Sequence, residues 1–314
     1  MKIDRKYIEK FINVTSKAAV ASSFLVGKND KLAADKAAVD SMRAELNKVD
    51  MIGKIVIGEG SLDEAPMLYT GEVLGNKQGP KFDIAVDPLE GTNFVANNLP
   101  GALSVIAIAN ESNLLGAPET YMDKISANLN EKGVVDLDYT IKENIYNLSE
   151  YKNKKPSMLT VCLLNRPRHK KIIEELQALK VKIKLITDGD ISGALLVTKE
   201  KNGVDLFLGV GGGPEGVLSA SALDAFDCFF QGKFLFVSDE EKEMARKAGI
   251  QNFDKKYELK DIVSGDSIFC ATGITNGDLV AGIKKKKYEF HLETFVTHKS
   301  SGLRKIIKTK QRFN

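Results

Sequence analysis

The sequence predicts a mixed α/β protein, and two patterns in the order of its residues carry that prediction. In the first half, short apolar runs at residues 55–57, 84–86 and 103–109 alternate with glycine-rich turns, which is typical of strands that end in loops. In the second half, strand-like runs alternate regularly with helix-like segments. With 314 residues and a hydrophobic content of 43%, the chain can also bury the core that this fold requires.

Two helices are expected before the first strand. Residues 8–12 and residues 34–46 each place apolar side chains at helical spacing. Asn29 or Asp30 stands where it can cap the second of these helices.

Four strands and three helices are expected in the second half. The strands are predicted at residues 159–164, 181–186, 204–208 and 288–298, and the helices at residues 167–179 and 191–197. A further helix follows residue 208, and the chain from Lys299 onward is basic and polar, as expected of a tail. The stretch 147–157 is the expected junction between an N-terminal lobe, residues 1–150, and a C-terminal lobe, residues 151–314.

The overall charge excludes a strong general attraction to nucleic acid or to anionic lipid. Lys and Arg number 45 and Asp and Glu number 42, so the net charge is only +3. Nor does any apolar stretch approach the roughly 20 residues that a membrane helix requires, and the N-terminal residues lack the pattern of a signal peptide. Neither a membrane nor a nucleic acid is therefore expected as a partner.

The three cysteines predict a reducing compartment. Cys162, Cys228 and Cys270 lie far apart in apolar stretches, which favours small buried side chains over a disulfide framework. We therefore expect a cytoplasmic protein.

The segment Asp87-Pro88-Leu89-Glu90-Gly91-Thr92 carries the sharpest chemical signal in the chain, because it directly follows an apolar strand. Two acids three residues apart, separated by a rigid turn, can direct oxygen atoms at one hard cation such as Mg²⁺ or Mn²⁺. A loop turn with solvated acids is the structural alternative.

Two further acids are ambiguous when each is taken alone. Glu59 stands between Gly58 and Gly60 at a strand end and is followed by Asp63 and Glu64, a pattern that an acidic turn would also produce. Asp35 lies in an alanine-rich helical stretch, where a solvated helix face is the ordinary explanation.

The glycine-rich segment 211–216 admits a rival function, because it satisfies the G-x-G-x-x-G pattern between a strand and a helix. That pattern can mark a dinucleotide site. Glu215 argues against it, since its negative charge would stand where the pyrophosphate should bind, and the strand also comes late in the chain.

Basic residues suggest two kinds of anion site. Arg166-Pro167-Arg168 opens a helix, and its guanidinium groups can clamp a phosphate or remain in a solvated turn. Residues 284–287, with the basic residues after Lys299, can instead form a nucleic-acid patch, which is the non-enzyme alternative.

Together these motifs resemble the class II fructose-1,6-bisphosphatases over nearly the whole chain. Matching segments occur in the family's order at residues 30–35, 57–60, 87–92, 117–122, 167–169, 188–190, 211–216 and 271–275. One departure is Arg166, which stands where a lysine is common in the family.

The resemblance implies roles for individual residues. The implied metal ligands are Asp35, Glu59, Asp87, Glu90 and Glu215. The implied substrate contacts are Glu90, Gly91, Thr92, Tyr121, Arg166, Pro167, Arg168, Asp188, Gly189, Asp190 and Gly212, with Lys31 adding positive charge. Thr92, Glu59 and Asp87 are the implied catalytic residues, so the N-terminal lobe would carry most of the metal ligands.

The resemblance also implies a fold and a reaction. The fold is a layered α/β/α/β/α sandwich of the sugar-phosphatase type. With two or more Mg²⁺ or Mn²⁺ ions, a metal-activated water would hydrolyse the 1-phosphate of fructose 1,6-bisphosphate, a gluconeogenic step, in a homo-oligomer (dimer or tetramer). Sedoheptulose 1,7-bisphosphate and inositol phosphates are the alternative substrates on the same fold.

Overall fold

The computed structural model describes residues 2–60 and 67–312, and its chain divides into two compact units. The first unit comprises Met1–Gly116 and Val263–Asn314, and the second comprises Ala117–Ile262. These limits differ from the expected lobes 1–150 and 151–314, because the chain after residue 263 returns to the sheet that its N-terminal part begins. The expected junction at 147–157 instead overlaps the end of helix α4 (Ile141–Tyr151).

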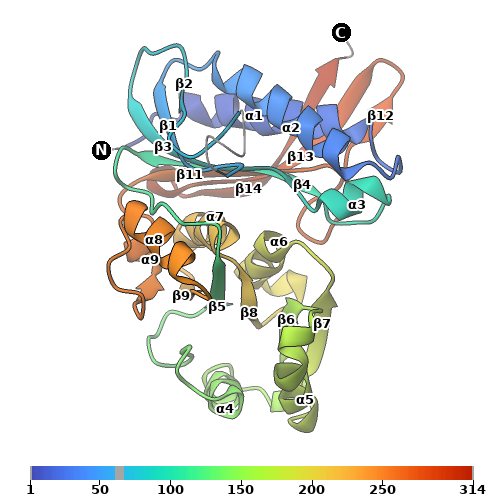
Figure 1. The fold of residues 1–314 in the computed structure, drawn as a ribbon. Helices are drawn as coiled ribbons and strands as arrows, with labels where there is room; N and C mark the ends of the chain where they lie inside the picture. The colour runs from blue at the N-terminus through green and yellow to red at the C-terminus, as the bar shows by residue number, and fades with distance from the viewer. Residues whose placement is uncertain (1, 61–66, 313–314) are drawn as a thin grey trace. The chain divides into compact units, whose positions relative to one another are not determined.

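The first unit is an eight-stranded mixed sheet with helices packed on one face (Figure 1). Its helices are α1 (Lys6–Ser23), α2 (Lys31–Leu46) and α3 (Thr92–Ala96). Its strands are β1 (Ile52–Ile57), β2 (Val73–Leu74), β3 (Lys81–Glu90), β4 (Leu103–Asn110), β11 (Ser267–Gly273), β12 (Lys284–Lys286), β13 (Glu289–His298) and β14 (Leu303–Arg312). Strands β1 and β3 are parallel, and the other pairings are antiparallel.

The two expected N-terminal helices are confirmed, and their apolar stripes explain their position. Phe11 from α1 and Met42 from α2 are fully buried against Ile84, Ile106 and other apolar residues of the sheet. Burial of such side chains contributes roughly 1.5–3 kcal/mol each relative to exposure. The Asp30 side chain accepts a hydrogen bond from the Ala33 N–H at 2.9 Å and so caps α2, one of the two residues predicted for that role.

The C-terminal segment is a strand, and the expectation of a polar tail was wrong. Strand β14 pairs with β13 along its whole length after a turn in which Gly302 adopts a φ of 65°. An edge strand needs only one face in contact with apolar neighbours, and Leu303 and Ile307 supply it here. Arg304 and Lys305 between them, with Lys308 and Lys310 after them, mask this alternation in the sequence.

The second unit is a six-stranded mixed sheet in the order β10-β9-β5-β8-β6-β7. Its strands are β5 (Tyr121–Ala127), β6 (Thr160–Leu164), β7 (Lys182–Ile186), β8 (Leu206–Gly212), β9 (Phe229–Leu235) and β10 (Lys256–Glu258). Besides α4, its helices are α5 (Lys170–Ala178), α6 (Asp190–Leu195), α7 (Gly213–Asp224), α8 (Asp239–Lys247) and α9 (Leu259–Ile262). Strands β6, β7 and β8 fall where strands were predicted at 159–164, 181–186 and 204–208, and they are parallel.

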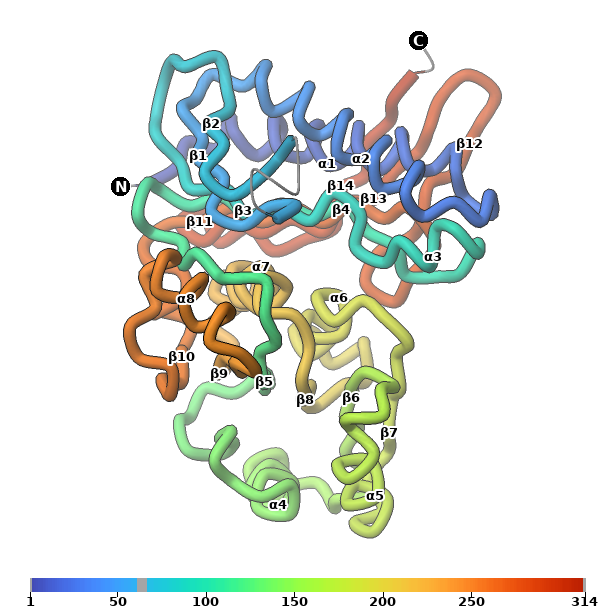
Figure 2. The backbone as a smooth tube through the Cα atoms, viewed as in Figure 1, coloured from blue at the N-terminus to red at the C-terminus, as the bar shows by residue number. Residues whose placement is uncertain are grey.

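Strand β5 shows that both faces of this sheet are covered (Figure 2). The Ser126 hydroxyl donates to Ala194 O of α6 at 3.3 Å, so one face of the strand meets that helix. Ile125 instead belongs to an apolar cluster with Leu148 of α4 and Leu176 of α5. The mixed α/β class is thus confirmed, with a helix layer on the first sheet and helix layers on both faces of the second.

The cysteines are buried, as expected. Cys162, Cys228 and Cys270 form no disulfide within the part of the chain that the structure describes. In residues 2–60 and 67–312, no helix has both the length and the apolar character needed to cross a bilayer.

Candidate active site

A bulge near the end of β3 brings two acidic side chains to the same face of the first sheet. Asp87 pairs with Val105 of β4 and Glu90 pairs with Leu103, so the β3 segment contains one residue more than the β4 segment. Val105 and Leu103 are two residues apart and share a face, and directly paired residues on antiparallel strands also share a face. The Asp87 and Glu90 carboxylates therefore project from one side of the sheet.

The Asp87-Pro88 segment lies inside the strand, so the expectation of a turn that follows the strand needs correction. Strand β3 continues to Glu90, and its pairing with β4 shifts register between Asp87 and Glu90. Pro88 has no N–H to donate to a ladder, which is compatible with a bulge. The local break thus re-aims the acids without ending the strand.

Gly91 is required by its backbone and by its neighbour. It adopts a φ of 83°, and a Cβ atom there would lie 2.6 Å from Phe94 Cδ2. Helix α3 begins at the next residue, Thr92, which places the Thr92 hydroxyl directly after the two acids.

Glu59 and Asp87 follow corresponding positions on two adjacent strands. Ile57 of β1 is in register with Ala85 of β3, and each acid lies two residues beyond its strand's member of that pair. Because parallel strands carry their carboxyl ends to the same edge of a sheet, both acids belong to that edge. The predicted neighbours Asp63 and Glu64 lie outside the described residues.

Asp35 lies on α2, which packs against β3 and α3. Burial raises the pKa of its carboxyl above the ordinary value. Lys31 is the first residue of the same helix and is exposed.

No preassembled metal cage is present in the part of the chain that the structure describes: no three His, Cys, Asp or Glu side chains there are grouped closely enough to hold an ion. The donors at the bulge are nevertheless all carboxylate oxygens, which hard divalent cations prefer. Mg²⁺ in particular usually uses one or two carboxylates, with substrate phosphate and water completing its shell. A pair such as Asp87 and Glu90 fits that kind of site.

The second unit contains a buried charge cluster that the sequence reading missed. Lys124 of β5 is 1% exposed, forms an ion pair with the Asp190 carboxylate, and donates to Gly212 O at 2.8 Å. A buried lysine is tolerated only when it is paired and hydrogen-bonded. The available signal was a lone lysine between the apolar residues Met122 and Ile125.

Glu215 is a buried acid beside this cluster. Burial and the negative charge of Asp190 raise the pKa of Glu215 to about 7, and Lys124 opposes that rise. Added positive charge nearby would favour the ionised form of Glu215.

The glycines of segment 211–216 make room for these charges. A Cβ atom at Gly211 would collide with the Asp190 carboxylate, one at Gly212 would collide with the Glu215 carboxylate, and one at Gly216 would lie 3.1 Å from Lys124 Cδ. The glycines thus accommodate acidic side chains of the protein, which agrees with the argument from Glu215 against a dinucleotide site.

Arg168 is held in place by two different contacts. Its Nε and Nη2 atoms donate to Val210 O at 3.0 and 2.8 Å, and its guanidinium carbon lies 4.9 Å from the centre of the Tyr121 ring. Two implied substrate contacts therefore adjoin each other, Tyr121 from β5 and Arg168 from the 3₁₀ turn after β6.

His169, next to Arg168 in the chain, links the end of β6 to β8. Its Nδ1 lies 2.7 Å from Leu164 O, and its Nε2 accepts from the Val210 N–H at 2.8 Å. Both ring nitrogens are engaged, and burial followed by the nearby Arg168 charge lowers the pKa of His169. His169 is therefore a buried packing residue.

The loops after β6 and β7 also meet. Arg166 Nη2 lies 3.6 Å from Asp188 Oδ1, Pro167 begins a short 3₁₀ turn, and Gly189 adopts a φ of 80° immediately before α6. These loops and the end of β8 leave the carboxyl ends of three parallel strands, a common place for ligands to bind.

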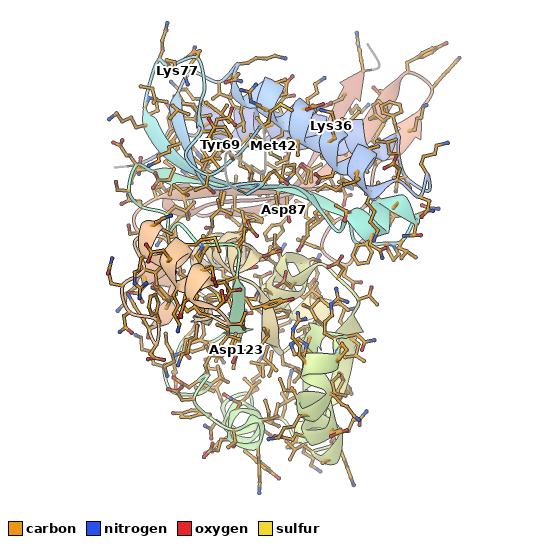
Figure 3. The ribbon with its side chains drawn as sticks, viewed as in Figure 1. Lys36, Met42, Tyr69, Lys77, Asp87 and Asp123 are labelled. Atoms are coloured by element: carbon orange, nitrogen blue, oxygen red, sulfur yellow. The ribbon has the colours of Figure 1, made fainter. Side chains whose placement is uncertain are left out.

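The predicted site residues therefore form one set in each unit. The first unit holds Lys31, Asp35, Glu59, Asp87, Glu90, Gly91 and Thr92. The second holds Tyr121, Arg166, Pro167, Arg168, Asp188, Gly189, Asp190, Gly212 and Glu215. Asp87 in the first unit and Asp123 of β5 in the second are labelled in Figure 3.

Comparisons with known proteins agree with these motifs. The family model described as bacterial fructose-1,6-bisphosphatase, glpX-encoded, matches residues 5–311. A D-fructose 1,6-bisphosphatase class 2/sedoheptulose 1,7-bisphosphatase of Synechococcus sp. (strain JA-3-3Ab) is 38% identical, covering 98% of this chain and 96% of the relative. One of the same description from Prochlorococcus marinus (strain MIT 9303) is 40% identical, over 90% of this chain and 89% of the relative.

Among solved structures, an inositol monophosphatase from Anabaena (Nostoc) sp. PCC 7120 aligns with a TM-score of 0.31 and 14% identity, over 61% of this chain and 69% of that chain. The match of the family model over nearly all of the sequence defines the class. The chain belongs to the glpX-encoded bacterial fructose-1,6-bisphosphatase family.

Proposed function

We propose that this chain hydrolyses the 1-phosphate of fructose 1,6-bisphosphate to give fructose 6-phosphate and phosphate. As a family member it is a phosphatase, and its substrate is a sugar bisphosphate. The structural observation that carries the proposal is the bulge that turns Asp87 and Glu90 to one face. Two carboxylates there can share a cation with a substrate phosphate.

Two or more Mg²⁺ or Mn²⁺ ions are proposed as cofactors. Their proposed ligands are Asp35, Glu59, Asp87, Glu90 and Glu215. When bound, such ions would offset phosphate charge and make a water molecule more acidic. The raised pKa of the buried Glu215 supports this assignment, because a bound cation would stabilise its ionised form.

Orientation of the attacking water and acceptance of its proton are assigned to side chains of the protein. Thr92, at the start of α3, would orient the attacking water, and Glu59 or Asp87 would accept its proton. Each of these acids lies two residues beyond the last residue pair of β1 and β3, which supports that assignment.

Substrate binding is assigned largely to the second unit. Arg168 would hold the second, non-reacting phosphate, because its guanidinium is already oriented by Val210 O and Tyr121. The other proposed contacts are Lys31, Glu90, Gly91, Thr92, Tyr121, Arg166, Pro167, Asp188, Gly189, Asp190 and Gly212.

Sedoheptulose 1,7-bisphosphate is a second candidate substrate, because relatives at 38–40% identity carry both activities in their names. The nucleic-acid alternative loses support from the structure of the basic region. Lys308 and Lys310 of β14 lie 3.3 and 3.1 Å from Glu293 and Glu289 of the neighbouring strand, so part of the positive charge is offset locally. A cytoplasmic homo-oligomer acting in gluconeogenesis completes the proposal.

A substrate panel tests the proposed function. Phosphate release should be measured from both sugar bisphosphates and from inositol phosphates, each with Mg²⁺, with Mn²⁺ or with a strong chelator. We expect fructose 1,6-bisphosphate to give the highest kcat/KM, the chelator to abolish turnover, and Glu90→Gln and Glu215→Gln to lose at least about 100-fold in kcat. Full activity under chelator would rule the scheme out.

A further inference from the structure

A second polar cavity lies at the other end of the parallel strands of the second unit. The carboxyl ends of β6 and β7 lead into Arg166 and Asp188, which belong to the proposed active site. At the amino ends of β6, β7 and β8, Thr160, Lys182 and Asp205 line a cavity of about 440 Å³. None of the residues lining this cavity belongs to the proposed catalytic or substrate set.

A nearly buried carboxylate positions two lysines in this cavity. Lys152 and Lys154, which follow α4, each place Nζ 3.0 Å from Asp205 Oδ1, and the Thr160 N–H donates to Oδ2 at 2.9 Å. Asp205 is 7% exposed and the Lys152 side chain is 18% exposed, so both are held within the protein, whereas the Lys154 side chain is 41% exposed and reaches solvent. Hydrogen bonds from Thr160 and both lysines outweigh burial and lower the pKa of Asp205, which keeps it ionised.

Positive charge exceeds negative charge around the cavity. Lys152, Lys154 and Lys182 supply three ammonium groups, against the carboxylates of Asp205 and Glu200. Each ammonium carries three N–H donors, and Asp205 Oδ1 accepts one from Lys152 and one from Lys154. The remaining N–H donors allow these lysines to bind a phosphate group while they stay paired with Asp205.

The apolar part of the lining gives the cavity room for more than an inorganic ion. Met158, Val197 and Val204 form part of its wall, and its volume lies in the range of small-molecule pockets, roughly 300–1,000 Å³. A phosphate group bound at the lysines would leave space for an attached organic group beside these side chains.

We propose that this cavity binds a small phosphate ester, with its phosphate held by Lys152, Lys154 and Lys182 and its organic part against Met158 and Val204. The proposal does not depend on the proposed function, since the two sites share no residue. Parallel strands β6, β7 and β8 connect the two ends of the sheet. Free inorganic phosphate has the same charge chemistry, and the experiment separates the two sources.

Lysine footprinting on the full chain tests the site directly. The protein is labelled with an amine-reactive acetylating reagent at constant ionic strength, while inorganic phosphate or glucose 6-phosphate is titrated, and labelling is read by peptide mass spectrometry. We expect Lys152, Lys154 and Lys182 to become protected together, at lower concentrations of glucose 6-phosphate than of phosphate. Equal potency would assign the site to free phosphate. Protection no greater than that of Lys242 and Lys247 on α8 would overturn the proposal.

Variants that strengthen and variants that weaken phosphate binding distinguish a binding site from a purely structural ion pair. Asp205→Asn releases both ammonium groups, so half-protection of Lys182 should occur at about tenfold lower ligand concentration. Lys152→Gln with Lys154→Gln should raise that concentration at least about tenfold, whereas the matched pair Lys242→Gln with Lys247→Gln should leave it unchanged. If Asp205→Asn fails to fold, Lys182→Gln, read at Lys152, must weaken protection. An unchanged concentration in these variants sinks the proposal.

Discussion

At the scale of single residues, Lys124 supplies positive charge to the buried acids Asp190 and Glu215 of the second unit. Its ammonium group pairs with Asp190 and binds Gly212 O, and its charge opposes the rise in the pKa of Glu215. Without it, the buried acids Asp190 and Glu215 would lose the positive charge that Lys124 supplies. We therefore assign Lys124 to positioning the site.

Replacing Lys124 should harm both stability and turnover, and a second change should separate the two effects. Lys124→Met leaves Asp190 buried beside Glu215, so the free energy of unfolding should fall by about 3 kcal/mol. Adding Asp190→Asn removes that uncompensated charge and should recover a large part of the stability but none of the activity. Denaturant titration and kcat/KM report the two quantities. Lack of any recovery would mean that the pair is not electrostatically coupled.

Replacing Arg168 should weaken the binding of sugar bisphosphates more than that of sugar monophosphates. The proposed clamp acts away from the reacting phosphate, so Arg168→Gln should raise KM for fructose 1,6-bisphosphate about 10- to 100-fold with a smaller effect on a sugar monophosphate. Lys170→Gln, which removes an exposed charge two residues away, is the matched control. Equal losses on both substrates would contradict the clamp.

At the scale of elements, irregularities place the acids of the first unit. The six-residue motif at 87–92 was found in the sequence because its residue types are distinctive. The bulge that turns Asp87 and Glu90 to one face depends on pairing with Val105 and Leu103, which lie more than ten residues further along the chain. Residue types thus predict the chemistry of such a site, while strand register determines its geometry.

The cap of helix α2 should contribute measurably to stability. Asp30→Ala removes the acceptor for the Ala33 N–H, so the free energy of unfolding should fall by about 1 kcal/mol. Asp30→Asn keeps a capping oxygen and serves as the control. Thermal or urea unfolding measures the difference, and equal losses in both variants would show that capping is not the cause.

At the scale of the whole molecule, local patterns predicted the mixed α/β class, both N-terminal helices and the strands β6, β7 and β8. They failed where a long-range contact decides the outcome. Strand β5 was missed because Asp123 and Lys124 interrupt its apolar run, although tertiary partners accommodate Lys124. The limits of the two units differ from the expected lobes because nothing near residue 263 indicates that the chain returns to β4.

Acid should destabilise the first unit partly through Asp266. Burial alone would raise the pKa of this carboxyl, but hydrogen bonds from Ser300 and from the Ile3 N–H at 2.6 Å lower it overall. The folded state therefore binds its proton less readily than the unfolded state, whose pKa is about 3.9. The stabilisation is full above that pH and is lost as pH falls through the lower folded pKa.

Asp266→Asn should remove this pH dependence. The variant should be less stable than the parent at pH 7, and the gap should narrow as the pH falls below about 4. Urea unfolding at a series of pH values measures the gap. A gap that stays constant with pH would show that Asp266 acts through shape alone.

The second unit interrupts the first, and this has a consequence for a chain made from its N-terminus on the ribosome. Residues 117–262 are contiguous and can condense as soon as they emerge, whereas β4 acquires its partner β11 only about 160 positions later. Until then one side of β4 presents open hydrogen-bonding groups. We therefore expect chaperones to bind the N-terminal part of the first unit, which includes β4, until β11 has been synthesised.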